Sequence, residues 1–455
     1  MTRLYLIALI SLFGSTLVFG QGITGDWTGK LTYAGTSLNV NFKVYQTEKG
    51  LASTFSVPLQ GLNDFKSTTT SFQDSLLTVD LKPLGIEYKG QLVKNDTVVG
   101  NFNQNGLSIK LTLSRTDFSK TRPQEPQPPY TYYEEEVVFR NEKDSISLAG
   151  TLTLPNKEGE YPVVILISGS GPQDRNSTIL GHKPFLLLAH ELTKSGVGVL
   201  RYDERGIGQS EGKFQEAELD DFVTDVKSAF DFLKKRKDVD HENIGLLGHS
   251  IGGIIAPKLA VEENISFLVL LAAPGIDGDK MMLQQRADLL KLRGLNEAQV
   301  KQSNAIFEET YQFIRKTTTE GTQFKNDLTQ FLTDNYSGMM MEKQLSMMVE
   351  QLTSKEVLGL LRNRPSTYLS MVQCPVLAIG GSNDFQVSSE ENLAAIETEI
   401  KKGGNDKVEV KEFEGLNHLF QESETGDSSE YELIEQTMSP KVLDYIKEWI
   451  KKTVK

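Results

Sequence analysis

The chain has 455 residues, of which 38% are hydrophobic and 24% charged, a composition typical of soluble globular proteins. That length allows more than one domain, each with its own core. The formal net charge is −13, and no basic stretch interleaved with aromatic residues interrupts the acidic composition. We therefore expect no nucleic-acid partner.

The first twenty residues have the three parts of a secretory signal peptide. Arg3 supplies the positive charge, residues 4–12 are apolar apart from Ser11, and small residues precede Gly20. We expect cleavage near Gly20 and export to the periplasm or the cell exterior. A membrane anchor is the alternative, but a span needs about twenty apolar residues and Ser11 interrupts this run, so we expect no span in the mature chain. The single cysteine, Cys374, cannot form an intramolecular disulfide.

Residues 22–118 alternate polar and apolar side chains in short stretches separated by Asn-Asp, Asn-Gly and Lys-Gly turns. This pattern predicts antiparallel β structure, either a small β-barrel or a sandwich. Residues 25–31 loosely resemble the strand that begins lipocalin-like barrels, which is too short a match to imply a ligand. The repeated prolines of residues 119–131 favour an extended backbone and predict an interdomain linker.

From residue 132 to the end, strand-like and helix-like segments alternate, which predicts a mostly parallel sheet with crossover helices. The sequence predicts strands at 134–140, 145–154, 163–167, 198–201, 244–247, 267–271, 376–379 and 408–413. It predicts helices at 185–194, 220–235, directly after Ser250, and at 439–451. Between about 275 and 370 the sequence is helical in character without a strand signal, which predicts a helical cap.

The segment Gly248-His-Ser250-Ile-Gly252 matches the Gly-x-Ser-x-Gly motif and lies between a predicted strand and a predicted helix. The glycines allow the strand to turn sharply into the helix, so that the hydroxyl of Ser250 faces a cleft. We predict that Ser250 is a nucleophile and that the backbone N–H of Ile251 donates to an oxyanion.

A serine nucleophile needs a base, and the five histidines are His182, His190, His241, His249 and His418. Only His418 lies downstream of Ser250, in a short loop after a predicted strand. His190 is surrounded by leucines on a predicted helix, and His249 is expected to point away from the side chain of Ser250. His182 is a loop residue for which a supporting role near the cleft is an alternative.

The acid that orients the histidine is expected after the strand that precedes the His418 strand, where Asp384 follows residues 376–379. Glu414 and Glu390 are the alternatives. With Asp384, the chain order is Ser, Asp, His, which is the order of α/β-hydrolases and differs from those of chymotrypsin and subtilisin.

A second oxyanion donor is expected in the small-residue loop 168–175, which follows the strand 163–167. Here the backbone amide of Ser170 is the best candidate. The loop lacks the Gly-Lys-Ser/Thr of a phosphate-binding loop and the third glycine of a dinucleotide-binding loop. Because the chain has no zinc-ligand spacing either, we expect no cofactor and no metal.

Three segments, 168–175, 201–210 and 248–252, together resemble secreted bacterial α/β-hydrolases of the short-chain carboxylesterase and serine-aminopeptidase-like (S33-type) set. The resemblance covers residues 134–455. It implies an α/β-hydrolase fold with an eight-stranded sheet, no cofactor, and ester hydrolysis as the usual activity. Ser168 stands where many relatives carry the histidine of a His-Gly oxyanion motif.

These observations predict a serine hydrolase that cleaves small-molecule esters of short to medium acyl chains through an acyl-serine intermediate. A peptidase is one alternative, because Asp277, Asp279 or Glu308 of the cap offers a carboxylate for a substrate's free N-terminus. A non-catalytic binding protein that works through its β domain is the other alternative, and the complete set of Ser250, Asp384 and His418 argues against it.

Overall fold

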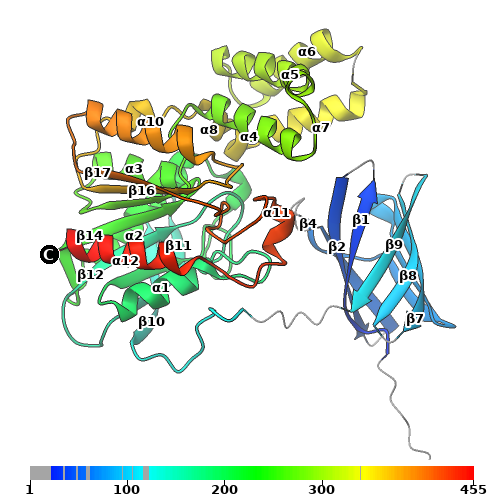
Figure 1. The fold of residues 1–455 in the computed structure, drawn as a ribbon, viewed down its shortest axis with the longest axis horizontal. Coiled ribbons are helices and arrows are strands. Elements are labelled where there is room, and N and C mark those ends of the chain that lie inside the picture. Colours follow the sequence, from blue (N-terminus) through cyan, green and yellow to red (C-terminus); the bar gives the residue numbers. More distant parts are fainter. Residues whose placement is uncertain are drawn as a thin grey trace, which may run out of the picture. The chain divides into compact units, whose positions relative to one another are not determined.

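The computed structural model describes residues 22–33, 36–47, 50–57, 62–94, 96–104, 106–115, 122–338 and 340–454. The predicted signal peptide and the first residues of the predicted linker lie outside these ranges. The chain divides into two compact units, Met1–Lys120 and Thr121–Lys455, each with a core of its own (Figure 1). None of the described helices combines the length and the apolar character needed to cross a bilayer.

The N-terminal unit is all β, as its alternating sequence predicted. A single antiparallel sheet has the order β4-β3-β2-β1-β9-β8-β7-β6-β5, and it curves so that Ser53 and Thr70, on β3 and β5, are hydrogen-bonded at 2.8 Å. The strands are β1 (Gly25–Tyr33), β2 (Thr36–Thr47), β3 (Gly50–Val57), β4 (Leu62–Lys66), β5 (Thr69–Gln73), β6 (Leu76–Leu81), β7 (Ile86–Lys94), β8 (Thr97–Gln104) and β9 (Leu107–Arg115), with the short helix η2 (Lys82–Leu84).

Large aromatic side chains fill the inside of this curved sheet. Trp27, Phe42 and Tyr88 are fully buried there, because alternate residues of each strand face inward. The Tyr88 hydroxyl lies 3.3 and 3.2 Å from the carbonyl oxygens of Val98 and Leu111, which satisfies its need for a hydrogen bond. Burial of this polar group raises the pKa of Tyr88 above its usual value.

The proline-rich segment binds to the C-terminal unit from residue 122 onward. The Arg122 guanidinium donates to the carbonyl oxygens of Ile434 at 2.6 Å and Leu180 at 2.9 Å. The Gln124 side chain donates to the Met438 carbonyl oxygen at 2.8 Å. Residues that the sequence predicted to be a linker are thus held by hydrogen bonds, and the boundary between the units lies before them.

The C-terminal unit is built on an eight-stranded mixed sheet of order β10-β11-β13-β12-β14-β15-β16-β17. The β10–β11 and β11–β13 pairs are antiparallel and the others are parallel. Each predicted strand is present, with ends that differ by a few residues. The strands are β10 (Tyr133–Asn141), β11 (Ile146–Leu154), β12 (Tyr161–Ile167), β13 (Gly198–Tyr202), β14 (Val239–His249), β15 (Leu268–Leu271), β16 (Val376–Gly381) and β17 (Val408–Phe413).

Helices cover both faces of this sheet, which explains why its central strands are continuous apolar runs. In β12, Val163 and Ile165 belong to one core, whereas Val164 and Leu166 belong to the other. Helices α2 (Leu219–Leu233), α3 (Gly252–Glu262) and α10 (Ser389–Lys402) pack on the first core, and α1 (Pro184–Lys194) and α12 (Pro440–Thr453) pack on the second (Figure 1). The short helices η3 (Phe214–Glu216) and α11 (Ser428–Tyr431) lie in connections.

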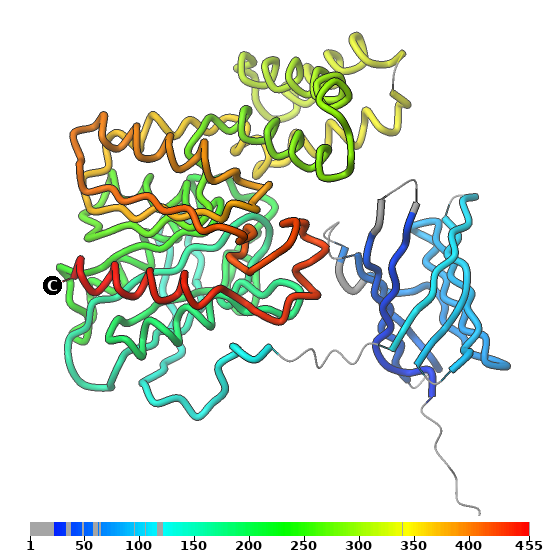
Figure 2. Tube along the Cα trace, viewed as in Figure 1, coloured from blue at the N-terminus to red at the C-terminus, as the bar shows by residue number. Residues whose placement is uncertain are grey.

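The segment between β15 and β16, predicted to be a cap, forms a helical insertion. Figure 2 follows the chain out of the sheet, through these green to yellow helices, and back. The helices are α4 (Gly278–Leu292), α5 (Glu297–Lys316), α6 (Gly321–Tyr336), α7 (Glu342–Leu352), α8 (Lys355–Arg362) and α9 (Ser366–Leu369). Helices α5 to α8 share a small core that includes Ile314, Leu328 and Leu332, each fully buried, and α4 packs against it.

The contacts of residues 122–131 predict that the position of an N-terminal truncation matters. A variant that begins at Thr121 should fold, because it keeps the whole second unit. One that begins at Tyr132 loses the Arg122 and Gln124 bonds and should lose on the order of 2 kcal/mol in free energy of unfolding. Urea unfolding of both variants measures this difference.

Single substitutions in the full chain provide the matched control for this truncation. Gln124→Ala should lower the unfolding midpoint of the second unit, whereas Gln127→Ala should not, because Gln127 is exposed. Equal midpoints for the two truncated variants would contradict a structural role for this segment.

Candidate active site

Ser250 lies at a sharp turn between a buried strand and a helix. Strand β14 ends at His249, α3 begins at Gly252, and Ser250 has a φ of 54°, in the left-handed region that few side chains adopt. Its amide donates to the carbonyl oxygen of Leu271 on the neighbouring strand at 2.9 Å. The turn is thus held by the sheet itself.

The two glycines of the motif are required by close backbone approaches. A Cβ at Gly248 would lie 2.1 Å from the carbonyl oxygen of Gly252. A Cβ at Gly252 would lie 2.2 Å from the carbonyl oxygen of Ile167, at the end of β12. No side chain fits at such distances, so both positions need glycine for packing at this turn.

His418 and Asp384 form a buried pair at the ends of neighbouring strands. Asp384 follows β16 and His418 follows β17, and Nδ1 of His418 lies 2.7 Å from Oδ2 of Asp384. The two residues are only 6% and 4% exposed. Oδ1 of Asp384 accepts the amides of Gln386 at 2.8 Å and Val387 at 2.9 Å, which fixes the carboxylate in one orientation.

The two rival acids lie elsewhere on the surface. Glu414 and Glu390 are both exposed. The structure therefore brings Asp384, rather than either glutamate, to the imidazole of His418. A carboxylate at Nδ1 places the hydrogen on that nitrogen and leaves Nε2 free to accept a proton.

His249 connects the serine turn to the histidine loop. Its Nε2 donates to the carbonyl oxygen of His418 at 2.9 Å, and the two rings lie 4.8 Å apart. Burial, together with the nearby His418, lowers the pKa of His249 to about 3, so its ring is neutral. The place of His249 inside the Gly-x-Ser-x-Gly motif is the one feature of the sequence that points to this contact.

The loop predicted to supply an oxyanion donor approaches Ser250 closely. A Cβ on Gly169 would lie 3.1 Å from Cβ of Ser250, and the next residue, Ser170, is exposed. Within the part of the chain that the structure describes, the amides of Ser170 and Ile251 donate no hydrogen bond. Both amides therefore lack an acceptor within the described residues.

The base of this loop is fixed by residues of the segment 201–210, one of the three segments that carry the resemblance to α/β-hydrolases. Glu204 is buried, and its carboxyl group accepts the Ser168 hydroxyl at 2.7 Å and the Gln173 amide at 2.9 Å. Burial raises the pKa of Glu204 to about 8. Asp203 accepts two bonds from the Arg175 guanidinium, at 3.1 and 2.8 Å.

The other histidines have structural partners. His182 is 1% exposed, and its ring nitrogens lie 3.0 Å from the Thr437 hydroxyl and 2.9 Å from the Tyr431 carbonyl oxygen. It thereby fixes the segment before α12. His190 lies 3.2 Å from the hydroxyl of Tyr132. These contacts explain both residues without a catalytic role.

The insertion carboxylates proposed for a peptidase differ in their surroundings. Asp279 is buried and lies 3.3 Å from each of two guanidinium groups, those of Arg315 and Arg364. Glu308 is exposed on α5, and Asp277 precedes α4 with Lys280 at 4.0 Å. The charge of Asp279 is therefore compensated within the insertion.

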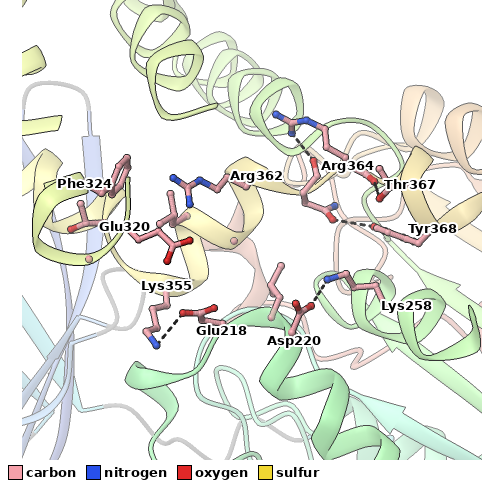
Figure 3. A pocket seen from close by; sticks show the side chains of 16 residues that line it. Glu218, Asp220, Lys258, Glu320, Phe324, Lys355, Arg362, Arg364, Thr367 and Tyr368 are labelled. Atoms are coloured by element: carbon pink, nitrogen blue, oxygen red, sulfur yellow. Dashed lines mark hydrogen bonds and ion pairs between the residues drawn. The ribbon is translucent and has the colours of Figure 1, made fainter. Parts of the chain in front are cut away.

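A separate cavity of about 810 Å³ lies between α2, α3 and the insertion helices (Figure 3). Ser250, Asp384 and His418 are not among its lining residues. Two pairs of its charged side chains form salt bridges, Lys355 with Glu218 at 3.3 Å and Lys258 with Asp220. Among the described residues, no cluster of three or more His, Cys, Asp or Glu side chains is arranged to hold a metal ion.

The chain is similar in sequence to two known proteins and has a detectable structural likeness to a third. EstD, an esterase of Thermotoga maritima, is 28% identical over 307 residues, which are 67% of this chain and 66% of EstD. An uncharacterized 31.7 kDa protein of Escherichia coli is 24% identical over 70% of this chain and 99% of its own length. The structure of the Pyrococcus furiosus esterase Pf2001 covers 72% of this chain and 99% of its own, with 17% identity and a TM-score of 0.42.

A family match covers more than half of the chain. Residues 183–424 match the family described as serine aminopeptidase, S33. This range contains Ser250, Asp384 and His418, whereas the loop with Ser170 precedes it. The chain therefore belongs to the S33 serine aminopeptidase family of hydrolases, within the α/β-hydrolase superfamily.

Proposed function

We propose that this chain is a serine carboxylesterase that hydrolyses esters of short to medium acyl chains through an acyl-serine intermediate. The observation that carries the proposal is the buried His418–Asp384 pair, with 2.7 Å between Nδ1 and Oδ2, formed by loops next to the strained turn at Ser250. Membership of a hydrolase family and the similarity to an esterase support it.

In the acylation half of the reaction, Oγ of Ser250 attacks the ester carbonyl carbon while Nε2 of His418 takes the hydroxyl proton. The negative charge that develops on the carbonyl oxygen is stabilised by the amides of Ile251 and Ser170, which have no acceptor within the described residues. The bond to the alcohol oxygen then breaks, and His418 gives its proton to that oxygen. The alcohol leaves, and the acyl group stays on Ser250.

Deacylation repeats these steps with water. Nε2 of His418 takes a proton from water, whose oxygen attacks the acyl carbon. The second tetrahedral intermediate collapses, the bond to Oγ breaks, and the proton returns to Ser250. The products are a carboxylic acid and the free enzyme, while Asp384 stays ionised and keeps the imidazole in one orientation.

The peptidase alternative is favoured by the description of the family itself. An aminopeptidase must bind the ammonium group of its substrate, for which the insertion offers Asp277, Asp279 and Glu308. Asp279 already pairs with two arginines, and Glu308 is exposed. We therefore place ester hydrolysis first.

Replacing the nucleophile or the base should abolish turnover without unfolding the protein. Ser250→Ala and His418→Ala should each lower kcat for p-nitrophenyl butyrate by several orders of magnitude, because the two residues act as a unit. A fluorophosphonate probe should label the wild type and not Ser250→Ala. If Ser250→Ala kept near-wild-type turnover, or if the probe labelled it, the proposed mechanism would be wrong.

The acid can be tested against its rivals with matched substitutions. Asp384→Asn should lower kcat by about 10⁴-fold, because an amide favours the wrong imidazole tautomer. Glu414→Gln and Glu390→Gln should retain wild-type kcat, since both side chains are exposed. A loss of activity in either control, with Asp384→Asn active, would reassign the acid.

Substrate size should be limited by the insertion, which joins β15 to β16 at the end of the sheet where Ser250 lies. In an enclosed acyl pocket each buried methylene contributes about 0.8 kcal/mol, so kcat/KM should rise about fourfold per methylene until the pocket is full. Overpacking then reverses the trend. A p-nitrophenyl ester series from acetate to palmitate should show an optimum at short to medium chains.

Two results of this series would contradict the proposal. A maximum at palmitate would indicate an open groove for long chains. Absence of ester cleavage, together with cleavage of amino-acid p-nitroanilides, would establish the peptidase alternative. Ser250→Ala measured in parallel separates enzymatic from spontaneous hydrolysis of the activated esters.

A further inference from the structure

The loop that carries Ser170 is held by carboxyl groups from two distant parts of the chain. Glu204, which follows β13, binds the two ends of the loop at Ser168 and Gln173. The middle of the loop is bound by Glu356 of the insertion, whose Oε1 accepts the Gly171 amide at 2.8 Å. One carboxyl group thus belongs to the sheet-bearing part of the unit and the other to the helical insertion.

Glu356 is in the first turn of α8, and α8 is anchored on the sheet-bearing part of the unit. At its start, Lys355 pairs with Glu218, next to the beginning of α2, at 3.3 Å (Figure 3). Further along, a Cβ on Gly359 would lie 3.0 Å from the side chain of Leu219. These contacts hold the helix where the Glu356 side chain reaches Gly171.

The hydrogen bond fixes a specific peptide plane. The plane between Ser170 and Gly171 contains the Ser170 carbonyl and the Gly171 N–H. Glu356 accepts that N–H, while Nε2 of Gln173 donates to the Ser170 carbonyl oxygen at 3.1 Å. With both sides of this plane held, the direction of the neighbouring Ser170 amide depends only on the φ and ψ of Ser170.

We propose that Glu356 is a positioning residue for the oxyanion hole, so that the insertion takes part in transition-state stabilisation as well as in enclosing the substrate. The proposal rests on the function proposed above, because it gives the Ser170 amide the role of an oxyanion donor. Without the Glu356 acceptor, only the Gln173 bond restrains the 170–171 plane, so the direction of the Ser170 amide is less firmly fixed.

The hydrogen bond from the Gly171 amide needs an acceptor oxygen at the distance that the Glu356 side chain spans, and it does not need a negative charge. Burial raises the pKa of both Glu356 and Glu204, and a carboxyl oxygen accepts an N–H bond whether the group is ionised or protonated. Glu356→Gln keeps an oxygen at the same distance from the backbone. Glu356→Asp keeps the charge but is one methylene too short.

The experiment compares these variants with Glu356→Leu in the full chain. Each is assayed for kcat and KM on p-nitrophenyl butyrate, for the inhibition constant of a butyl boronic acid, and for Tm. Boronic acids mimic the tetrahedral intermediate, so their affinity reports the oxyanion hole. Glu342→Leu is the matched control, because Glu342 occupies the first turn of α7 and is exposed.

We expect Glu356→Leu and Glu356→Asp to lower kcat by about tenfold or more, a fraction of the loss caused by removing an oxyanion donor outright. Their KM should stay nearly unchanged, and the boronic acid should bind more weakly by a factor similar to the loss in kcat/KM. Glu356→Gln and Glu342→Leu should behave like the wild type in all four measurements.

Other outcomes would overturn the proposal. Wild-type kcat and boronic acid affinity in Glu356→Asp would show that the contact does not position the oxyanion donor. A loss in Glu356→Gln equal to that in Glu356→Leu would assign the effect to charge. If Glu356→Leu does not fold, the comparison of Glu356→Gln with Glu356→Asp tests the proposal in its place. Ester turnover that persists in Ser250→Ala refutes the proposed function instead, whatever the Glu356 variants do.

Discussion

The turn at Ser250 is the constraint on which the site depends. A φ of 54° at a residue with a side chain costs on the order of 1–3 kcal/mol, and the surrounding structure must hold it. It is held by the bond from the Ser250 amide to Leu271 and by glycines whose neighbours leave no room for a Cβ. Since β14 pairs with β12 on one side and β15 on the other, this strain is supported by the centre of the sheet.

The same sheet brings the remaining groups to the serine. Parallel strands end at the same edge, so the loops that follow β12, β16 and β17 meet where β14 turns into α3. Beyond the ends of the strands, hydrogen bonds fix the backbone of these loops. Asp384 accepts two amides of its own loop, and His249 donates to the backbone carbonyl of His418. The positions of the side chains are thus fixed by polar contacts between loops, on a scaffold of apolar strands.

Much of this arrangement is predictable because it follows from local patterns. Apolar runs predict the strands of the mixed sheet. The Gly-x-Ser-x-Gly segment between a strand and a helix predicts Ser250 as the candidate nucleophile. The order of the strands then favoured Asp384 and His418, which the structure pairs. Contacts between residues far apart in sequence have no such signature. The Gly171–Glu356 bond spans 185 positions and the Arg122–Ile434 bond spans 312, so no local pattern predicts either of them.

The place of the insertion in the sheet has an evolutionary consequence. It joins β15 to β16, which are hydrogen-bonded neighbours with Leu268 opposite Val376, so its two ends stay fixed whatever lies between them. The entropy of closing such a loop grows only with the logarithm of its length, by about 0.6 kcal/mol per doubling. Helices can therefore be gained, lost or exchanged there while the strands keep their register. Substrate selectivity can then change while the proposed catalytic residues stay in place. The bond to Gly171 limits that freedom, because a replacement segment must still bring an acceptor oxygen to the same amide.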